Sequence, residues 1–232
     1  MSHRLTRYQE RIFRNQGYLV VEGTLSPEQC ETAIEKAESL GVNCAPSTIM
    51  QPHRDDAYFL ELLLSQKSIT EPIEAIIGPP VVGLATQFYF SPQGSSGLMK
   101  HQDNYCVEAP DGMFASCWIP LIDVDAENGC LMVYPGTHKS GLVDVRPLCK
   151  AEIRATYPNI LEEACVLSDS AKPVVLPLTR GTGVFLDGAL VHESLPNTKP
   201  AKRYAFLATY LRKGAPFRPG YTAKREEVEL DL

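Results

Sequence analysis

The sequence has no uninterrupted apolar run close to the roughly 18 residues that a membrane-spanning helix needs. Its beginning also differs from a secretory signal, because charged side chains interrupt every apolar stretch, at Arg4, Arg7, Glu10, Arg11 and Arg14. A C-terminal peroxisomal tripeptide of the Ser-Lys-Leu kind is lacking as well. These absences predict a cytoplasmic protein with no membrane partner.

Basic residues and paired cysteines are also scarce. The 28 Asp and Glu residues outnumber the 22 Lys and Arg residues, for a formal charge of −6. This balance argues against a nucleic-acid partner, because a phosphate-binding surface needs clustered cations. None of the seven cysteines forms a C-x-x-C pair, so neither a disulfide framework nor a thiolate zinc site is indicated, and we expect reduced thiols.

The first third of the chain has the periodicity of helices. Apolar residues recur at helical spacing in four segments, 5–16, 26–40, about 57–66 and about 69–77. A short strand is expected between the first two helices, at 18–21. A polar loop from Val42 to Asp56 could cover a site.

From residue 81 the pattern changes to short β-rich runs that Gly, Pro and Asn turns separate. The expected strands are 81–90, 98–103, 114–122, 130–134, 174–178, 183–186, 189–194 and 203–212. Many short strands with such turns indicate a sandwich or barrel. We therefore predict a single domain over residues 1–232 that is mainly β with flanking helices. It would comprise a helical N-terminal support (about 1–80), a β core (about 81–212) and an insert of loop and short helix (about 147–170).

Three residues could hold a metal ion. His101 and Asp103 are two positions apart in an extended stretch, so their side chains share one face. His192 follows a tight Asp-Gly turn on a later strand. Two histidines and one carboxylate on one face of a metal leave three positions open, which is the arrangement of non-haem Fe(II) oxygenases.

A fourth residue could hold an organic acid. Arg203 stands on an alternating strand 11 positions after His192. A guanidinium among apolar neighbours needs an anion, and its planar fork suits a carboxylate. If a 2-oxo acid chelates the metal, Arg203 could bind the far carboxylate and Ser194 or Thr182 could add a hydroxyl.

From Gly17 to Leu211 the chain resembles the phytanoyl-CoA dioxygenase family of Fe(II)/2-oxoglutarate oxygenases. The resemblance rests on four motifs in the expected order: His101-Gln102-Asp103; Trp118 to Asp125 with Glu127-Asn128-Gly129-Cys130-Leu131; Tyr134-Pro135-Gly136-Thr137-His138-Lys139; and Asp187 to Ser194 followed by Arg203.

The resemblance implies a double-stranded β-helix, which is a cupin-like jelly roll with helices on one side. It also implies that His101, Asp103 and His192 bind Fe(II), and that Arg203 with Ser194 holds the far carboxylate of 2-oxoglutarate. Gln87 is similar to a position that often touches this co-substrate. The enzyme would use O2 and release succinate and CO2.

The resemblance leaves the reaction and the substrate less defined. Related halogenating enzymes lack the carboxylate of Asp103, so its presence argues for oxygen transfer. We expect hydroxylation of an unactivated C–H bond in a small metabolite or natural-product intermediate, and we favour this over a CoA thioester because the basic residues near the site are scattered. Candidate substrate contacts are Tyr89, Asn104, Tyr105, Trp118, the 43–56 loop and the 147–170 insert.

Several alternatives remain open. The same chemistry could give desaturation or rearrangement, and the fold could instead serve a non-catalytic cupin-like metal- or ligand-binding protein or a metal-dependent isomerase. A second His-x-Asp sequence, His53-Arg54-Asp55, lies in the polar loop, where we expect a surface or lid segment and no metal. His138 follows a Pro-Gly turn and is expected to be a structural hydrogen-bonding group. The oligomeric state stays open.

Overall fold

The computed structural model describes residues 3–41, 47–149, 152, 163–220 and 224–230. The four expected helices are confirmed as α1 (Arg7–Gln16), α2 (Pro27–Leu40), α3 (Ala57–Leu64) and α4 (Lys67–Ile77). Helices α1 and α2 each begin with a capping box, in which the hydroxyl of Thr6 or Ser26 accepts from the backbone three residues on. Among the described residues, no helix is long and apolar enough to cross a membrane.

A seven-stranded antiparallel sheet forms the larger half of the β core. Its strands in spatial order are β1 (Tyr18–Val21), β9 (Gly183–Asp187), β4 (Phe114–Pro120), β11 (Arg203–Arg212), β3 (Val81–Ser91) and β12 (Val228–Glu229), with β2 (Thr48–Met50) also paired to β3. A smaller sheet contains β10 (His192–Ser194), β5 (Leu131–Val133) and β8 (Val174–Leu176), and a separate pair is formed by β6 (Val145–Pro147) and β7 (Glu163–Cys165).

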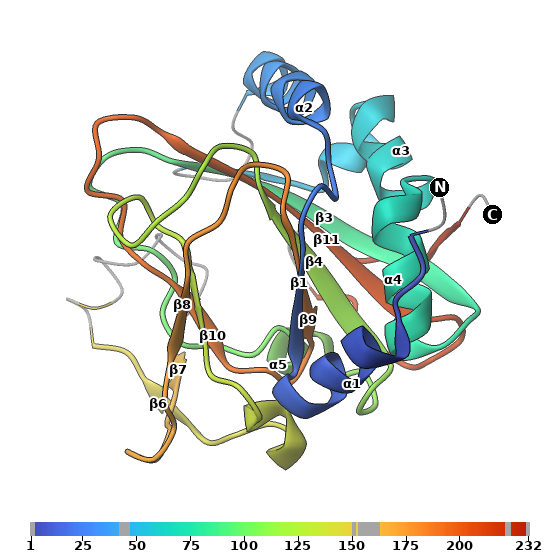
Figure 1. Cartoon of the computed structure of the whole chain (residues 1–232), viewed down its shortest axis with the longest axis vertical. Coiled ribbons are helices and arrows are strands. Elements are labelled where there is room, and N and C mark those ends of the chain that lie inside the picture. Colours follow the sequence, from blue (N-terminus) through green and yellow to red (C-terminus); the bar gives the residue numbers. More distant parts are fainter. Residues whose placement is uncertain (1–2, 42–46, 150–151, 153–162, 221–223, 231–232) are drawn as a thin grey trace.

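The two faces of the large sheet are both buried, against different partners. Its outer face packs on the helices, where Phe59 of α3 contacts Phe88 and Phe206 with ring centroids 5.9 and 5.7 Å apart. Its inner face, with Trp118 and Leu207, packs against the small sheet. Figure 1 shows α1 to α4 on one side of the large sheet and β8 and β10 on the other. The predicted jelly roll with helices on one side is confirmed.

Some elements differ from the expectation. Residues 98–103 do not form a regular strand; they are joined to β10 by an isolated bridge between His101 and His192 and by two hydrogen bonds between Leu98 and Ser194. Strands β1 and β2 lie in the large sheet, so the first 80 residues contribute to the β core as well as supporting it. The expected loop contains β2 and a 3-10 turn, η1 (Pro52–Arg54). The insert contributes β7, while most of its middle lies outside the described residues.

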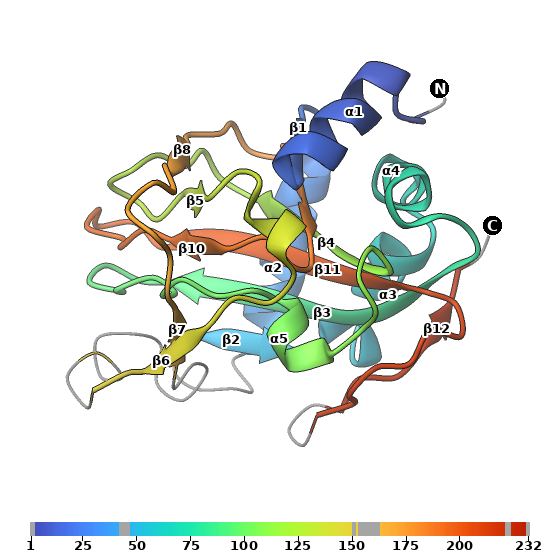
Figure 2. The same ribbon diagram turned by 90° about the horizontal axis from the view of Figure 1, so that it is seen from below.

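Two short helical elements lie at one end of the core. They are α5 (Asn104–Val107), which directly follows Asp103, and η2 (Thr137–Ser140). A third apolar cluster joins Val107 of α5 to Phe114 and Leu211 at the ends of β4 and β11, with Phe217 packed against it. Phe217 belongs to the C-terminal strap, which we define as residues 213–220 and 224–230. Figure 2 shows the strap running from the end of β11 toward α5 and back to β12.

Candidate metal centre

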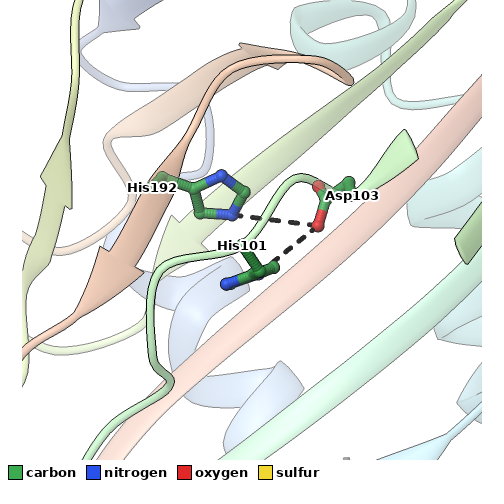
Figure 3. Close-up of side chains that lie close together, drawn as sticks. All are labelled: His101, Asp103 and His192. Atoms are coloured by element: carbon green, nitrogen blue, oxygen red, sulfur yellow. Dashed lines mark ion pairs between the residues drawn. The ribbon is translucent and has the colours of Figure 1, made fainter. Parts of the chain in front are cut away.

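Backbone pairing brings the three predicted metal ligands together. The antiparallel bridge between His101 and His192 sets their rings side by side, with centroids 4.2 Å apart. Asp103 follows within the same turn, and its Oδ1 lies 3.6 Å from Nε2 of His101 and 3.8 Å from Nε2 of His192. Figure 3 shows the three side chains converging. One ligand atom from each of the three residues lies within 4.8 Å of the other two, so a single ion could contact all three.

The remaining polar atoms of the triad are held by neighbours. Nδ1 of His101 donates to the carbonyl of Met99 at 2.8 Å, and Nδ1 of His192 donates to the carbonyl of Leu190 at 3.0 Å. This arrangement leaves both Nε2 lone pairs for a metal, as in most histidine metal ligands. The hydroxyl of Ser116 donates to Oδ2 of Asp103 at 2.9 Å and so leaves Oδ1 facing the histidines.

Burial shifts the protonation of His101 toward metal binding. Burial, together with the neighbouring His192, lowers the pKa of His101 to about 4. The imidazole is therefore neutral at physiological pH, and only neutral imidazole can ligate a metal. Two imidazoles and one carboxylate form a donor set that suits Fe(II). The residues present therefore fit the ion that the family resemblance implies.

Gln102 lies between the two ligands and faces away from them. It is 2% exposed, and its Nε2 donates to the carbonyls of Gly141 at 2.9 Å and Ala189 at 2.5 Å. Its Oε1 accepts from the backbone of Val143 at 2.9 Å. The amide thus joins the His101–Asp103 turn both to the loop before His192 and to the segment that leads into the insert.

A small cavity of about 30 Å³ connects the triad to Arg203. Arg203 is 3% exposed, its Nη2 lies 2.5 Å from Oγ of Ser91, and its guanidinium carbon lies 5.8 Å from the centre of the Trp118 ring. Ser194 lines the same cavity, and its Oγ accepts from the backbone of Leu98 at 2.8 Å. The rest of the lining is largely apolar: Tyr89, Leu98, Leu131, Leu186 and Leu207.

Four further predicted residues do not line this cavity, and their roles stay predictions. The side-chain carbonyl of Gln87 accepts from the Tyr89 hydroxyl, and Thr182 pairs with the hydroxyl of Thr179 at 3.1 Å. Asn104 makes two hydrogen bonds of 2.9 Å to the backbone of Ala109 and lines a different cavity. Tyr105 points toward the insert, where its hydroxyl donates to Glu163 at 2.5 Å.

The expectation of a surface position for His53 is wrong. The side chain is 6% exposed and lies under β3, with its Nδ1 2.7 Å from Oγ1 of Thr86. The buried position arises because η1 folds back under the sheet, where Gln51 donates from its backbone to the carbonyl of Thr86. Within the described part of the chain, the only group of three metal-ligating side chains is the one that contains His101.

Two residues of the site were not predicted from the sequence. Ser116 lies on the expected strand 114–122, whereas Ser91 was expected in the turn after strand 81–90 and is the last residue of β3. A hydroxyl at an inward position of a buried strand is the only local signal for Ser116. The observed contact of His138 agrees with the structural role expected for it, since its Nε2 donates to the carbonyl of Arg14 at 3.2 Å.

Comparisons with known proteins place the chain in a family. Residues 13–205 match the family model described as Phytanoyl-CoA dioxygenase (PhyH). A relative from Arabidopsis thaliana, named Phytanoyl-CoA dioxygenase, is 24% identical over 253 residues that cover 87% of this chain and 87% of the relative.

Solved structures with a similar fold include two from nogalamycin biosynthesis. The epimerase SnoN, in complex with Fe3+, alpha ketoglutarate and nogalamycin RO, has a TM-score of 0.74 at 19% identity over 97% of this chain and 95% of SnoN. The alpha ketoglutarate dependent carbocyclase SnoK has a TM-score of 0.74 at 20% identity over 95% of this chain and 89% of SnoK. At these identities the likeness shows the fold.

Proposed function

The chain belongs to the phytanoyl-CoA dioxygenase family of Fe(II)/2-oxoglutarate-dependent oxygenases, and we propose that it hydroxylates an unactivated C–H bond of a small metabolite or natural-product intermediate. The enzyme uses Fe(II), 2-oxoglutarate and O2. The observation that carries the proposal is the convergence of His101, Asp103 and His192 in the cavity that Arg203 also lines.

In this proposal each residue of the cavity has one task. His101, Asp103 and His192 hold Fe(II) through two imidazole nitrogens and one carboxylate oxygen. Arg203 binds the far carboxylate of 2-oxoglutarate, because its buried guanidinium provides a charged fork, and Ser194 adds a hydroxyl. The hydroxyl of Ser91, 2.5 Å from Nη2, orients that fork.

The apolar lining would serve the same reaction by keeping water out of the cavity. Leu98, Leu131, Leu186 and Leu207 surround the cavity and leave little room for water. Low polarity strengthens the attraction between Arg203 and a carboxylate. When bound, Fe(II) and 2-oxoglutarate supply the activation of dioxygen, with succinate and CO2 as co-products.

Hydroxylation is the finer part of the proposal, and the intact carboxylate of Asp103 supports it. Solved structures of similar fold include an epimerase and a carbocyclase, so related active sites support other outcomes. Product analysis tests this part: the proposed product is heavier than the substrate by one oxygen atom. A product of unchanged mass, or one that has lost hydrogen, would show epimerisation or ring closure instead.

An anaerobic titration tests the metal and co-substrate assignment. Fe(II) and 2-oxoglutarate together should give a visible charge-transfer band in the wild-type protein, and Asp103→Ala should not form it. Leu40→Ala, at an exposed apolar side chain at the end of α2 and outside the cavity, is a suitable control and should keep the band. A wild-type band that persists in Asp103→Ala would contradict the assignment.

The thiols support a reducing compartment, and we propose the cytoplasm. Six cysteines lie in the described part of the chain, and all six are free: Cys30, Cys106, Cys117, Cys130, Cys149 and Cys165. Free thiols persist where glutathione and thioredoxin keep them reduced. Fractionation of cells that express the chain with a tag would test this proposal.

A further inference from the structure

The C-terminal strap fastens the helix that follows the metal ligand Asp103. Arg218 donates from its backbone to the carbonyl of Val107 at 2.6 Å and from Nη2 to the carbonyl of Tyr105 at 2.9 Å. Its Nη1 also forms an ion pair with Glu108 at 3.1 Å. These contacts satisfy carbonyls at the end of α5 that have no partner within the helix. The family model matches residues 13–205, so Arg218, which donates these hydrogen bonds, lies outside the matched part of the chain.

Arg225, on the returning half of the strap, is held in place from both sides. The carbonyl of Lys224 accepts from Nη2 of Arg54 at 2.5 Å, and Glu226 forms an ion pair with the same atom at 3.8 Å. The backbone of Arg225 donates to the carbonyl of Pro219 at 2.9 Å. The position of its side chain is therefore set by the fold.

The two ends of the Arg225 guanidinium have different surroundings. Nη1 lies within hydrogen-bond distance of three carbonyls, those of Cys106 at 3.2 Å, Arg218 at 3.3 Å and Pro219 at 3.5 Å. Nε and Nη2 have no hydrogen-bond partner among the described residues, and neither atom is buried away from solvent. No acidic side chain in the described part of the chain lies within 4.0 Å of Arg225, whereas Arg218 has Glu108.

This position is next to the metal centre. Helix α5 begins directly after Asp103, and Cys106, whose carbonyl holds Nη1, is one helical turn further on, roughly 5 Å along the axis. Burial lowers the pKa of Arg225, while the Asp103 carboxylate acts in the opposite direction.

Because Nε and Nη2 of the half-buried Arg225 are open to solvent and have no partner among the described residues, an anion that reaches them gains two charge-assisted hydrogen bonds. The Nε–Nη2 edge presents two parallel N–H donors, which match the two oxygens of a carboxylate. We propose that Arg225 is a specificity-determining residue that binds a carboxylate of the substrate through Nε and Nη2. The substrate is then a small organic acid whose carboxylate sits at the strap, with the reacting carbon several bonds away at the iron. This inference rests on the proposed oxygenase function.

Paired probes test the inference with simple acids in place of the substrate. Pentanoate and benzoate are compared with pentanamide and benzamide, which keep the shape and lack the charge. The first readout is the change that each probe causes in the visible band of the anaerobic protein with Fe(II) and saturating 2-oxoglutarate. The second is the shift of the Arg225 Nε–H signal in the NMR spectrum of the protein without iron, a signal that Arg225→Lys removes and so assigns.

The acids should change both readouts and the amides neither. Arg225→Gln should require at least about tenfold more acid for the same change in the band, because it removes the charge-assisted hydrogen bonds to the carboxylate. Arg225→Lys should weaken acid binding less than Arg225→Gln does, since it keeps the charge and loses only the fork. Arg218→Gln is the matched control: it loosens the same strap and should leave the preference of acids over amides intact.

Three results would overturn the inference: equal responses to acids and amides, an unchanged acid response in Arg225→Gln, or no response to either kind of probe. A failure of the proposed function looks different, since the wild-type protein would then show no band with Fe(II) and 2-oxoglutarate alone. The Nε–H signal needs no iron and still tests Arg225 in that case.

Discussion

The hydroxyl of Ser116 donates to Oδ2 of Asp103 at 2.9 Å, while Oδ1 of the same carboxylate faces Nε2 of both His101 and His192. One oxygen is therefore held by the sheet, and the other is free to bind an ion. This division of roles orients the carboxylate before any ion arrives. Partners of this kind fix the direction of a ligand and its basicity.

Ser116→Ala should lower the affinity for Fe(II) by roughly 10- to 100-fold, the usual effect of losing a hydrogen bond to a metal ligand. Titration of Fe(II) at saturating 2-oxoglutarate, followed by the visible band, measures the change. Ser39→Ala, on the outer surface of α2, serves as the control and should keep the wild-type affinity. An unchanged affinity in Ser116→Ala would mean that Asp103 needs no support.

Arg203→Lys should weaken 2-oxoglutarate binding by roughly 10- to 150-fold, because the substitution keeps the charge and removes the two-pronged contact. Titration of 2-oxoglutarate at saturating Fe(II) measures this loss. Fe(II) binding itself should stay close to wild type, since Arg203 contacts none of the three ligands through any hydrogen bond or ion pair described above. Equal losses of iron and 2-oxoglutarate binding would point to a general collapse of the cavity.

His53 should make the folded protein less stable in acid. Burial lowers its pKa to about 4 from the ordinary value of 6.5, with the Arg54 charge acting in the same direction. The unfolded chain takes up a proton as the pH falls through about 6.5, but the folded protein does not do so until about 4. Stability is therefore lost across this window, by up to about 3 kcal/mol.

Urea unfolding at several pH values measures this loss. His53→Gln should show a shallower fall in the free energy of unfolding between about pH 7 and about pH 4.5 than wild type. Burial acts in the same direction on His101, so the comparison is between the slopes of the variant and the wild type, both without iron. His3→Gln, at an exposed position, should keep the wild-type slope. If the free energy of unfolding falls equally steeply with pH in wild type, His53→Gln and His3→Gln, His53 does not cause the loss of stability in acid.

Gly17→Ala should destabilise the protein by roughly 2–4 kcal/mol. Gly17 has φ +81°, and an added Cβ would lie 2.4 Å from Nδ1 of His138 and 2.9 Å from Cδ1 of Leu190. Gly23→Ala is the matched control, because Gly23 has φ +67° and nothing within 4 Å of an added Cβ. Thermal unfolding of both variants separates the effect of the close Cβ contact from the effect of the positive φ. If both variants lose the same stability, the positive φ alone explains the loss in Gly17→Ala.

The convergence of the triad could be expected from the sequence through the family's order of motifs, and the face on which Arg203 lies could be expected from the alternation of its strand. Strand β11 begins at Arg203 and ends at Arg212, the same residues that the alternating pattern predicts. The alternation fixes the face on which Arg203 lies. Asp103 reaches the same site as His101 although the strand expected at 98–103 is absent, because the chain turns into α5 at Asp103. For Arg203, the face expected from the alternating sequence is the face on which the side chain lies in the structure.

Other positions depend on contacts that leave no local signal. His53 is buried and hydrogen-bonds Thr86, 33 residues away, and Arg225 reaches Cys106 across 119 residues. Helix α5 has four residues, which is too short for a helical periodicity to be recognised. In each case the position follows from the packing of distant segments, which neither composition nor spacing encodes.

Gln102, between the two ligands, contacts Gly141 and Val143 on one side and Ala189 on the other. The side-chain amide of Gln102 therefore links the turn that carries His101 and Asp103 to the segment that leads into the insert. If a ligand that orders the segment from Gly141 to Val143 strengthens iron binding through this amide, iron strengthens the binding of that ligand by the same factor. The order of the segment from Gly141 to Val143 would then depend on whether iron is bound at His101 and Asp103.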